Sequence, residues 1–335
     1  MNYLRMLSRR LLVLAMTVWA AATINFILPK VAPGNPVAEV IAQASMEGRA
    51  VDMTSMVKAY EEKFGLGRPV FEQYVTYLGD IATLDLGYSI SAYPARVWDL
   101  ISEALPWTVG LLLTATLIAF ATGSVFGAMV AWPHAPRWIK RTAPGVMLFS
   151  AIPYYLIGLV LIYLLSFRLK AFPTGGGHSV GVQPGTDLSS WLDIMYHAVL
   201  PASSIVIASI GTWAISMRSL MVSNLGEDYM NFGEARGLRR TRLFWQYAVR
   251  NSLLPQVTAL GLSLSHIVSG AILVEVIFSY PGIGSLLLRA VTVNDYFLIY
   301  GISLVIIVTI ALTMLVLELV YPLLDPRIRT EGPHA

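Results

Sequence analysis

Six long apolar stretches alternate with polar connections along this chain. Each stretch is long enough to cross a bilayer as a helix, since about 20 apolar residues rising ~1.5 Å apiece span the hydrocarbon core. Proline removes a backbone donor and clashes with the preceding turn, so Pro153 is expected to kink the third span. We expect an all-α membrane protein with six transmembrane helices, near residues 11–28, 108–132, 144–167, 198–217, 258–278 and 296–321.

The longest polar connection, residues 30–104, follows the first span. Helical periodicity at 53–64 and 70–84 predicts a helical insertion that is interrupted at 65–69. A segment this short would bury too little apolar surface for an independent enzyme domain. We therefore divide the chain into an N-terminal tail with the first span (1–29), the insertion (30–104), a core of five spans (105–321) and a C-terminal tail (322–335).

The basic residues predict the orientation in the membrane. Fourteen of the 23 Lys and Arg lie in residues 1–10, 133–141, 218–255 and 322–335, although the other connections are longer in total. Because cytoplasmic loops carry the excess of Lys and Arg, both termini are expected inside and the 30–104 insertion outside. Hydrophobicity continues past Ala20–Ala22 to Leu28, which favours an uncleaved first span over a signal peptide.

The connection between the fourth and fifth spans, residues 218–255, carries six arginines against three acids. Its polar residues Arg239, Arg242, Gln246 and Arg250 recur at helical spacing, and its apolar residues Leu243, Phe244, Tyr247 and Ala248 share another face. Two interpretations are open on this pattern alone. Either the apolar face is free to dock into a groove on a soluble partner, or the arginines of an ordinary cytoplasmic loop only fix the topology.

Composition narrows the chemistry. The chain is 56% hydrophobic and 13% charged, and it has no cysteine, so a disulfide framework and Cys-based metal sites are excluded. Its net charge of +3 equals that of the arginine-rich loop, which does not indicate nucleic-acid binding. No phosphate-binding G-x-x-x-x-G-K-[ST], H-E-x-x-H or G-x-S-x-G motif occurs, and the five histidines are scattered. We expect no catalytic residue, metal site or cofactor in this chain.

Three polar residues of the predicted fifth span are candidates for lining a pathway: His266, Ser269 and Glu275. Ionisable groups in a bilayer are costly and usually face a bundle interior. Glu275 therefore either lines a pore or is a buried structural acid paired across helices. A lone histidine such as His266 is more often a packing residue than a ligand or proton relay. Ser269 belongs to a small-residue face that suits close helix packing.

Residues 228–255 resemble the cytoplasmic "EAA" loop of permease subunits in bacterial ABC importers, most closely the dipeptide/oligopeptide/nickel branch. One departure concerns the acid of the general pattern, whose position is Asn231 here, so that Glu234 lies out of register. Further stretches resemble the branch at 32–36, 64–70, 85–89, 274–284 and 325–329. Within the loop the matching residues are Asp228, Tyr229, Ala235, Arg236, Gly237, Leu238, Arg250, Asn251, Leu253, Leu254 and Pro255.

The resemblance implies a permease subunit that forms half of a translocation pathway for peptides or similar solutes, such as oligosaccharides or opines, in the bacterial inner membrane. Its implied partners are a second homologous permease, two cytosolic ATPases that bind ATP and Mg, a periplasmic solute-binding protein and membrane lipid. An ion-coupled secondary transporter is the alternative; it would be expected to show inverted repeats. The implied ATPase-coupling residues are Tyr229, Glu234, Ala235, Arg236, Gly237, Leu238 and Arg239.

A glycine-rich connection at residues 172–188 lies on the side where the binding protein would dock. Gly175, Gly176, Gly177 and His178 are candidates for contact with that protein. A loose loop without such a contact is the competing interpretation.

Overall fold

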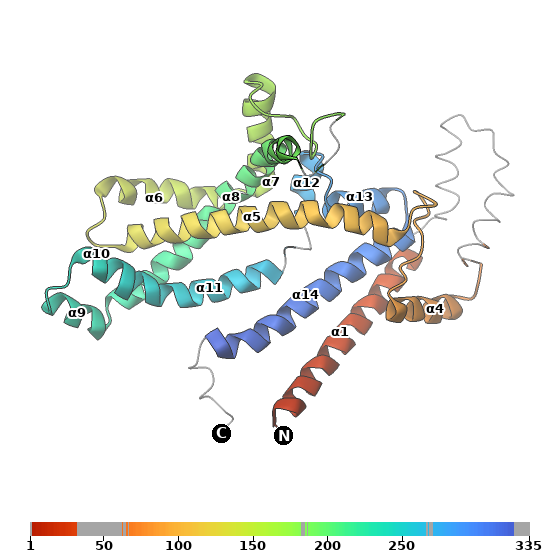
Figure 1. Ribbon diagram of the computed structural model, residues 1–335, viewed down its shortest axis with the longest axis horizontal. Coiled ribbons are helices and arrows are strands. Elements are labelled where there is room, and N and C mark those ends of the chain that lie inside the picture. Colours follow the sequence, from red (N-terminus) through yellow and green to blue (C-terminus); the bar gives the residue numbers. More distant parts are fainter. Residues whose placement is uncertain are drawn as a thin grey trace. The chain divides into compact units, whose positions relative to one another are not determined.

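The computed structural model describes residues 2–31, 67–181, 187–265 and 271–324, together with residues 62, 65, 185 and 267. The regular elements in this part are helices, and Tyr88 and Arg96 form an isolated antiparallel bridge. The α-helices are α1 (Asn2–Val31), α4 (Val70–Thr83), α5 (Val97–Ala131), α6 (Arg137–Phe149), α7 (Tyr154–Leu161), α8 (Leu188–Leu225), α9 (Asp228–Ala235), α10 (Arg240–Arg242), α11 (Arg250–Ser265), α12 (Ile272–Ile277), α13 (Ile283–Thr292) and α14 (Tyr296–Leu324) (Figure 1). Two π-helical segments, η1 (Ile162–Arg168) and η2 (Leu243–Val249), continue α7 and α10.

Within these described residues, four helices are long and apolar enough to cross a membrane: Ser8–Ile27, Val97–Ala131, Leu188–Leu225 and Tyr296–Val316. The predicted third span is broken rather than kinked, because α6 and the α7–η1 helix meet at an angle of 101°. Counted as one span, this pair makes five. The predicted fifth span corresponds to α11 and α12, and residues 266 and 268–270 between them lie outside the described residues. A count of six therefore stays a prediction.

The predicted helix at residues 70–84 is confirmed as α4. The predicted helix at 53–64 falls almost wholly outside the described residues. By its contacts the chain divides into two compact units, residues 1–106 with 282–315 and residues 107–281 with 316–335. Two helices, α5 and α14, each contribute to both units.

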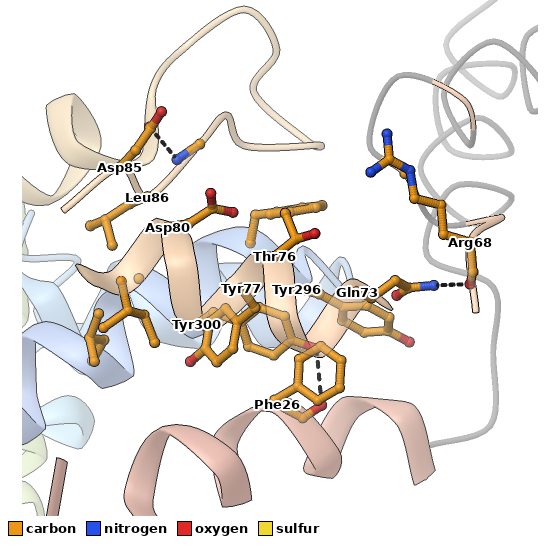
Figure 2. Close-up of a pocket in the computed structure, with 16 residues that line it drawn as sticks. Phe26, Arg68, Gln73, Thr76, Tyr77, Asp80, Asp85, Leu86, Tyr296 and Tyr300 are labelled. Atoms are coloured by element: carbon orange, nitrogen blue, oxygen red, sulfur yellow. Dashed lines mark hydrogen bonds between the residues drawn. The ribbon is translucent and has the colours of Figure 1, made fainter. Parts of the chain in front are cut away.

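Aromatic side chains form one core of the first unit. Phe26 of α1 stacks on Tyr77 of α4, with ring centroids 5.5 Å apart, and lies 6.0 Å from the ring of Tyr300 of α14 (Figure 2). Beside them is a pocket of about 230 Å³ whose lining includes Asp80 and Asp85. Partial burial raises the pKa of Asp80, and the nearby charge of Asp85 raises it further.

A buried carboxylate ties the loop after α4 to the start of α14. The side chain of Asp295 is fully buried. Its Oδ2 accepts hydrogen bonds from Ser89 Oγ at 2.5 Å, Ser91 Oγ at 2.8 Å and the Ser91 amide at 2.9 Å. Its Oδ1 accepts the amide of Leu298 at 3.1 Å, which caps the helix. The carboxylate thus accepts hydrogen bonds from donors of both the loop and the helix end.

Close helix crossings shape the second unit. A Cβ atom at Gly127 of α5 would lie 2.2 Å from the carbonyl oxygen of Ala214 in α8, and one at Gly123 would lie 2.6 Å from that of Ile210. Only glycine permits this approach of α5 to α8. A Cβ at Gly211, on the same helix α8, would meet Val146 of α6 at 2.8 Å. The crossings fix α5, α6 and α8 against one another.

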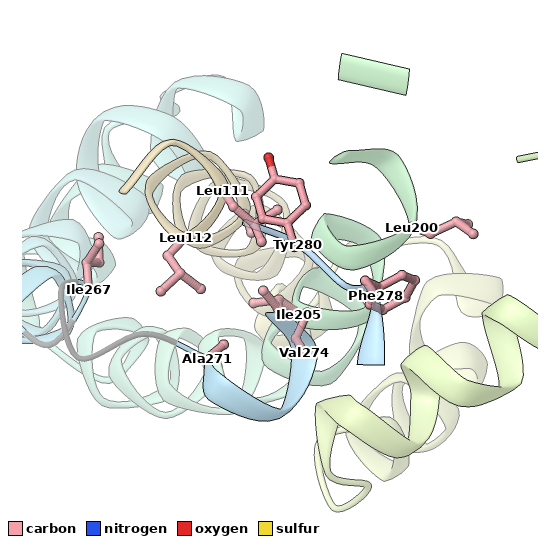
Figure 3. Close-up of a cluster of buried hydrophobic side chains, with 10 residues drawn as sticks. Leu111, Leu112, Leu200, Ile205, Ile267, Ala271, Val274, Phe278 and Tyr280 are labelled. Carbon is pink, nitrogen blue, oxygen red and sulfur yellow. The ribbon is translucent and has the colours of Figure 1, made fainter. Parts of the chain in front are cut away.

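An apolar cluster fills the space between α5, α8 and α12 in the same unit. Its members include Leu111, Leu200, Val274 and Phe278, all nearly inaccessible to solvent (Figure 3). Helix α8 begins at a capped end, where Asp187 accepts hydrogen bonds from the side chain and the amide of Ser190. Hydrogen bonds from Ser189 and Ser190 lower the pKa of Asp187 from its ordinary 3.8 to about 2. The stabilisation from this cap is therefore fully present above pH 3.8 and is lost as the pH falls through about 2.

We expect Asp295→Ala to destabilise the first unit by about 3 kcal/mol, because it leaves the buried hydroxyl of Ser89, the Ser91 amide and hydroxyl, and a helix-end amide without their acceptor. Thermal unfolding of the purified chain in detergent measures the loss as a lower Tm. Glu103→Gln, an exposed acid in the same unit, is the matched control and should stay within about 0.5 kcal/mol of the parent. An unchanged Tm for Asp295→Ala would contradict the role assigned to this carboxylate.

Candidate functional site

Residues 228–255, hereafter the coupling segment, fold as two short helices followed by η2, which runs directly into α11. The predicted amphipathic helix is confirmed, and its two faces are as the spacing predicts. Leu243, Phe244 and Ala248 are buried, whereas Arg239, Arg242, Gln246 and Arg250 are exposed. One difference is that Leu243–Val249 winds as a π-helix, wider than an α-helix.

Of the two interpretations that the spacing left open, the one in which the apolar face of this helix stays free is wrong. It packs inside the chain, in a cluster with Ala128 and Trp132 of α5 and with Met217 and Met221 of α8. The rings of Trp132 and Phe244 meet edge to face at 5.3 Å. Helical periodicity identifies residues that share a face but does not say what covers them. Burial against the chain's own helices makes the coupling segment part of the second unit rather than a loose arm.

The outer surface of the coupling segment is what a partner could contact. Two large apolar side chains lie there, Phe232 with 69% and Trp245 with 54% of its surface exposed. The predicted coupling residues divide between the two surfaces. Glu234, Ala235, Arg236, Gly237 and Arg239 are exposed, whereas Tyr229 and Leu238 pack against the buried cluster.

Gly237 ends α9 with a left-handed turn. Its φ is +70°, a conformation that side chains other than glycine rarely adopt. The Gly237 amide donates to the carbonyl of Glu234 at 2.9 Å, and the Leu238 amide donates to that of Gly233 at 3.2 Å. These two bonds form a Schellman motif, which closes the helix and sends the chain back toward the buried cluster.

Buried polar side chains join the coupling segment to the neighbouring helices. Asn224 of α8 donates to Ser252 at 2.8 Å. One turn further, the fully buried Gln256 donates to the carbonyl of Trp213 at 3.0 Å and accepts from Ser216 Oγ at 2.8 Å. Its Nε2 also lies 3.3 Å from Ser124 Oγ on α5. One amide thereby joins α11 to two other helices, α8 and α5.

Sequence reasoning did not single out Gln256 or Asp295. Gln256 could have been found from its position, because it is an amide side chain directly after Pro255 at the start of an apolar stretch. Such residues usually form hydrogen bonds across membrane helices. Asp295 lies just before the last span, where an acid reads as an ordinary loop residue; its burial depends on Ser89 and Ser91, some 200 positions earlier.

Of the predicted pathway residues, His266 and Ser269 lie outside the described residues. Glu275 of α12 is fully buried, and its Oε1 accepts a hydrogen bond from Thr108 of α5 at 2.8 Å. This geometry suits a structural acid paired across helices. A pathway role for Glu275 in another conformation stays a prediction.

The glycine-rich loop is anchored where the predicted contact residues lie. The Gly176 amide donates to the carbonyl of Phe278 at 2.8 Å, and a Cβ at Gly175 would lie 2.5 Å from that oxygen. His178 is partly buried beside Trp107, with ring centroids 6.2 Å apart. The following Ser179 is held by Asp193 through its amide and hydroxyl. The exposed part of the loop begins at Val180.

Among the residues that the structure describes, no group of three or more His, Asp or Glu is placed to hold a metal ion. Together, the apolar helices and the arginine-rich coupling segment packed against them define a polytopic membrane protein whose distinctive surface is suited to contact with a partner.

Comparison with known proteins identifies the family. Residues 123–330 match the family model of the binding-protein-dependent transport system inner membrane component, and the chain belongs to this family of ABC importer permeases. It is 31% identical over 313 residues to the oligopeptide transport system permease protein AppB of Bacillus subtilis, covering 91% of this chain and 93% of the relative. It is 32% identical to the di/tripeptide transport system permease protein DppB of Pseudomonas aeruginosa, covering 97% and 99%. The protein is therefore a multi-pass inner-membrane component.

Among solved structures, the chain is similar to one of the inward-facing MetNI methionine ABC transporter. The identity is 13% and the TM-score 0.46, with 70% of this chain and 97% of that chain covered.

We expect Gln256→Leu to cost about 1–2 kcal/mol, because Ser216 and the Trp213 carbonyl lose their partner among buried helices. The measurement is thermal unfolding of the purified chain in detergent. Gln246→Leu is the matched control, since that exposed glutamine accepts only a hydrogen bond from Arg242 in the same segment. Equal losses in the two variants would show that the buried amide contributes nothing beyond a surface one.

Proposed function

We propose that this chain is the membrane-spanning permease subunit of an ATP-driven importer and forms half of a translocation pathway for peptides. The family assignment and the peptide permeases named above support the transport role and the solute class. The observation that carries the proposal is the coupling segment, which is fixed to α5 and α8 on one side and exposed on the other.

The proposed assembly contains a second homologous permease, two cytosolic ATPases and a periplasmic solute-binding protein, set in membrane lipid. ATP and Mg are bound by the ATPases, and this chain needs no cofactor. It crosses the membrane six times with both termini in the cytoplasm. The positive-inside distribution of Lys and Arg supports this orientation, since the coupling segment then faces the ATPases.

The exposed surface of the coupling segment would dock in a cleft of one ATPase. Closure of the ATPases would push on this surface, and the buried cluster would pass the push to α5 and α8. A rigid connection is needed for this, because a loose loop would absorb the displacement. The packing of Phe244 on Trp132 and the bonds of Gln256 supply that rigidity. This is a coupling between two sites through an element with two states.

At the opposite side of the membrane, the exposed loop that begins at Val180 would reach the solute-binding protein. Gly175, Gly176, Gly177 and His178 would hold its base, with Asp193 as a second anchor. Val180 itself is fully exposed. Anchored residues followed by an exposed Val180 suit a loop that contacts a partner.

The alternative of an ion-coupled secondary transporter is not favoured by the family assignment. Such a transporter would need ion-coordinating groups near the membrane midplane. Glu275, an acid in the predicted fifth span, accepts a hydrogen bond from Thr108.

The assembly is tested by purifying the detergent-solubilised chain from its native membrane and identifying the co-purifying proteins by mass spectrometry. We expect a second permease and one or two P-loop ATPases. Reconstituted vesicles containing these proteins and the binding protein should accumulate peptide only with ATP. A chain that purifies alone and moves solute along an ion gradient would overturn the proposal in favour of the secondary transporter.

A charge at the end of α9 should uncouple the importer. We expect Gly237→Asp to abolish ATP-driven uptake in vesicles while the ATPases keep their catalytic activity, because the new charge and the strained turn disturb the docking surface. Gly237→Asn, which matches aspartate in shape and adopts the left-handed turn but is neutral, should retain most of the uptake. Parental uptake by Gly237→Asp would contradict the docking role.

A further inference from the structure

The break in the third span opens a cavity that lies apart from the coupling segment and the glycine-rich loop. Helix α6 ends at Phe149 and α7 begins at Tyr154, and the two are bent by 101°. At this break lies an open cavity of about 430 Å³, bounded on its other sides by α8 and by Ser263 of α11. Non-helical backbone within a membrane protein is tolerated where it is buried in protein or lines a water-filled space.

The lining of this cavity is uncharged, and half of its residues carry a hydroxyl group. Its hydroxyl-bearing residues are Ser150, Tyr154, Ser209, Thr212 and Ser263, and none of its ten residues is ionisable in the physiological range. Serine and threonine in helices commonly bond back to the preceding turn. Thr122 of α5 does so, but within the described residues the structure shows no hydrogen bond from the hydroxyls of Ser209, Thr212 or Ser263.

The broken backbone adds acceptors to these donors. The amides of residues 150–152 each donate to the carbonyl three positions earlier. The carbonyls of residues 150–152, however, accept no hydrogen bond within the described part of the chain. Among the described residues, the cavity is therefore lined by residues with unbonded hydroxyls on α8 and α11 and by residues with unbonded carbonyls at the break. A peptide main chain presents the complementary alternation of N–H and C=O groups.

The same helices connect this cavity to the coupling segment. Ser263 lies two turns beyond Gln256 on α11, which continues directly from η2. Gln256 donates to the carbonyl of Trp213, and Trp213 itself lines the cavity. A displacement of the coupling segment would thus move two walls of the cavity. This is the arrangement expected of a space through which solute passes.

We propose that this cavity contacts the main chain of the transported peptide through the hydroxyls of Ser209, Thr212 and Ser263. The proposal rests on the proposed function and names the solute contact within it. Recognition of the main chain would be independent of the peptide's sequence. The uncharged lining lacks the carboxylates that a bare divalent cation requires, so such ions are not expected to bind there.

The test compares two solutes and two permeases in vesicles that contain the complete importer. The solutes are a tripeptide that the binding protein accepts and its N-methylated analogue, which lacks one main-chain donor. The variant permease is the triple substitution Ser209→Ala, Thr212→Val and Ser263→Ala. The same binding protein is used with all four combinations of solute and permease. Its own preference between the two solutes therefore cancels when the ratios of uptake rates are compared.

We expect the triple variant to take up the tripeptide about fivefold or more slowly than the parent, with ATPase stimulation by the loaded binding protein retained. The parent should distinguish the tripeptide from its analogue more strongly than the variant does. The control Thr122→Val removes a hydroxyl that bonds only within α5 and should change nothing. An unchanged rate in the triple variant, or equal discrimination by both permeases, would overturn the proposal.

A second measurement tests the proposal even if the triple variant fails to fold. The chain has no cysteine, so Thr212→Cys places a single thiol in the cavity. We expect transported tripeptide to slow its modification by a small thiol reagent, and labelling that is indifferent to the solute would count against the proposal. Protection by an oligosaccharide instead would replace the peptide assignment. Absence of ATP-driven uptake by the parent would fault the proposed function itself, before any variant is made.

Discussion

A polar group buried among apolar helices must find its hydrogen-bond partner inside the protein, and the second unit is arranged around this requirement. The side-chain amide of Gln256 forms hydrogen bonds with a backbone carbonyl and a hydroxyl of α8 and with a hydroxyl of α5. Asn224 and Ser252 pair in the same way, and Glu275 takes the hydroxyl of Thr108. Each bond joins elements that are distant in sequence, so together they fix the register in which the apolar clusters pack.

The cavity at the helix break differs from this bonded scaffold, because it is lined by polar groups that have no hydrogen-bond partner in the described part of the chain. Thr122 and Ser252 bond to their own helix backbone, and Thr108 and Ser216 bond to side chains of other helices. Ser209, Thr212 and Ser263 face an open space instead. Satisfied groups hold the scaffold together, while unsatisfied ones are available to a solute. Both kinds of group lie on α8 and α11, the helices that meet at the coupling segment.

Much of this could be predicted from sequence, and the limits have physical causes. Spacing identified the two faces of the helix at Arg239–Arg250, because residues that recur every three or four positions share one face of a helix whatever surrounds it. The same spacing could not say that Leu243 and Phe244 are covered by α5 and α8. The glycine-rich composition of residues 172–188 left a loose loop open as an interpretation, yet Gly175 is required for close approach to Phe278. A proline at 153 indicated a distortion of the third span but not its angle.

The glycine crossings of α5 and α8 limit how this protein can change shape. With backbone so close that a methyl group at Gly127 would strike Ala214, neither helix can slide or roll on the other without a collision. The two helices therefore form a rigid body, and shear between them is unavailable as a mode of opening. Motion would then have to be hinged where the helices are interrupted, and the turn at residues 150–153 is one such interruption. Opening and closing of the pathway would then deform the wall that carries the free carbonyls.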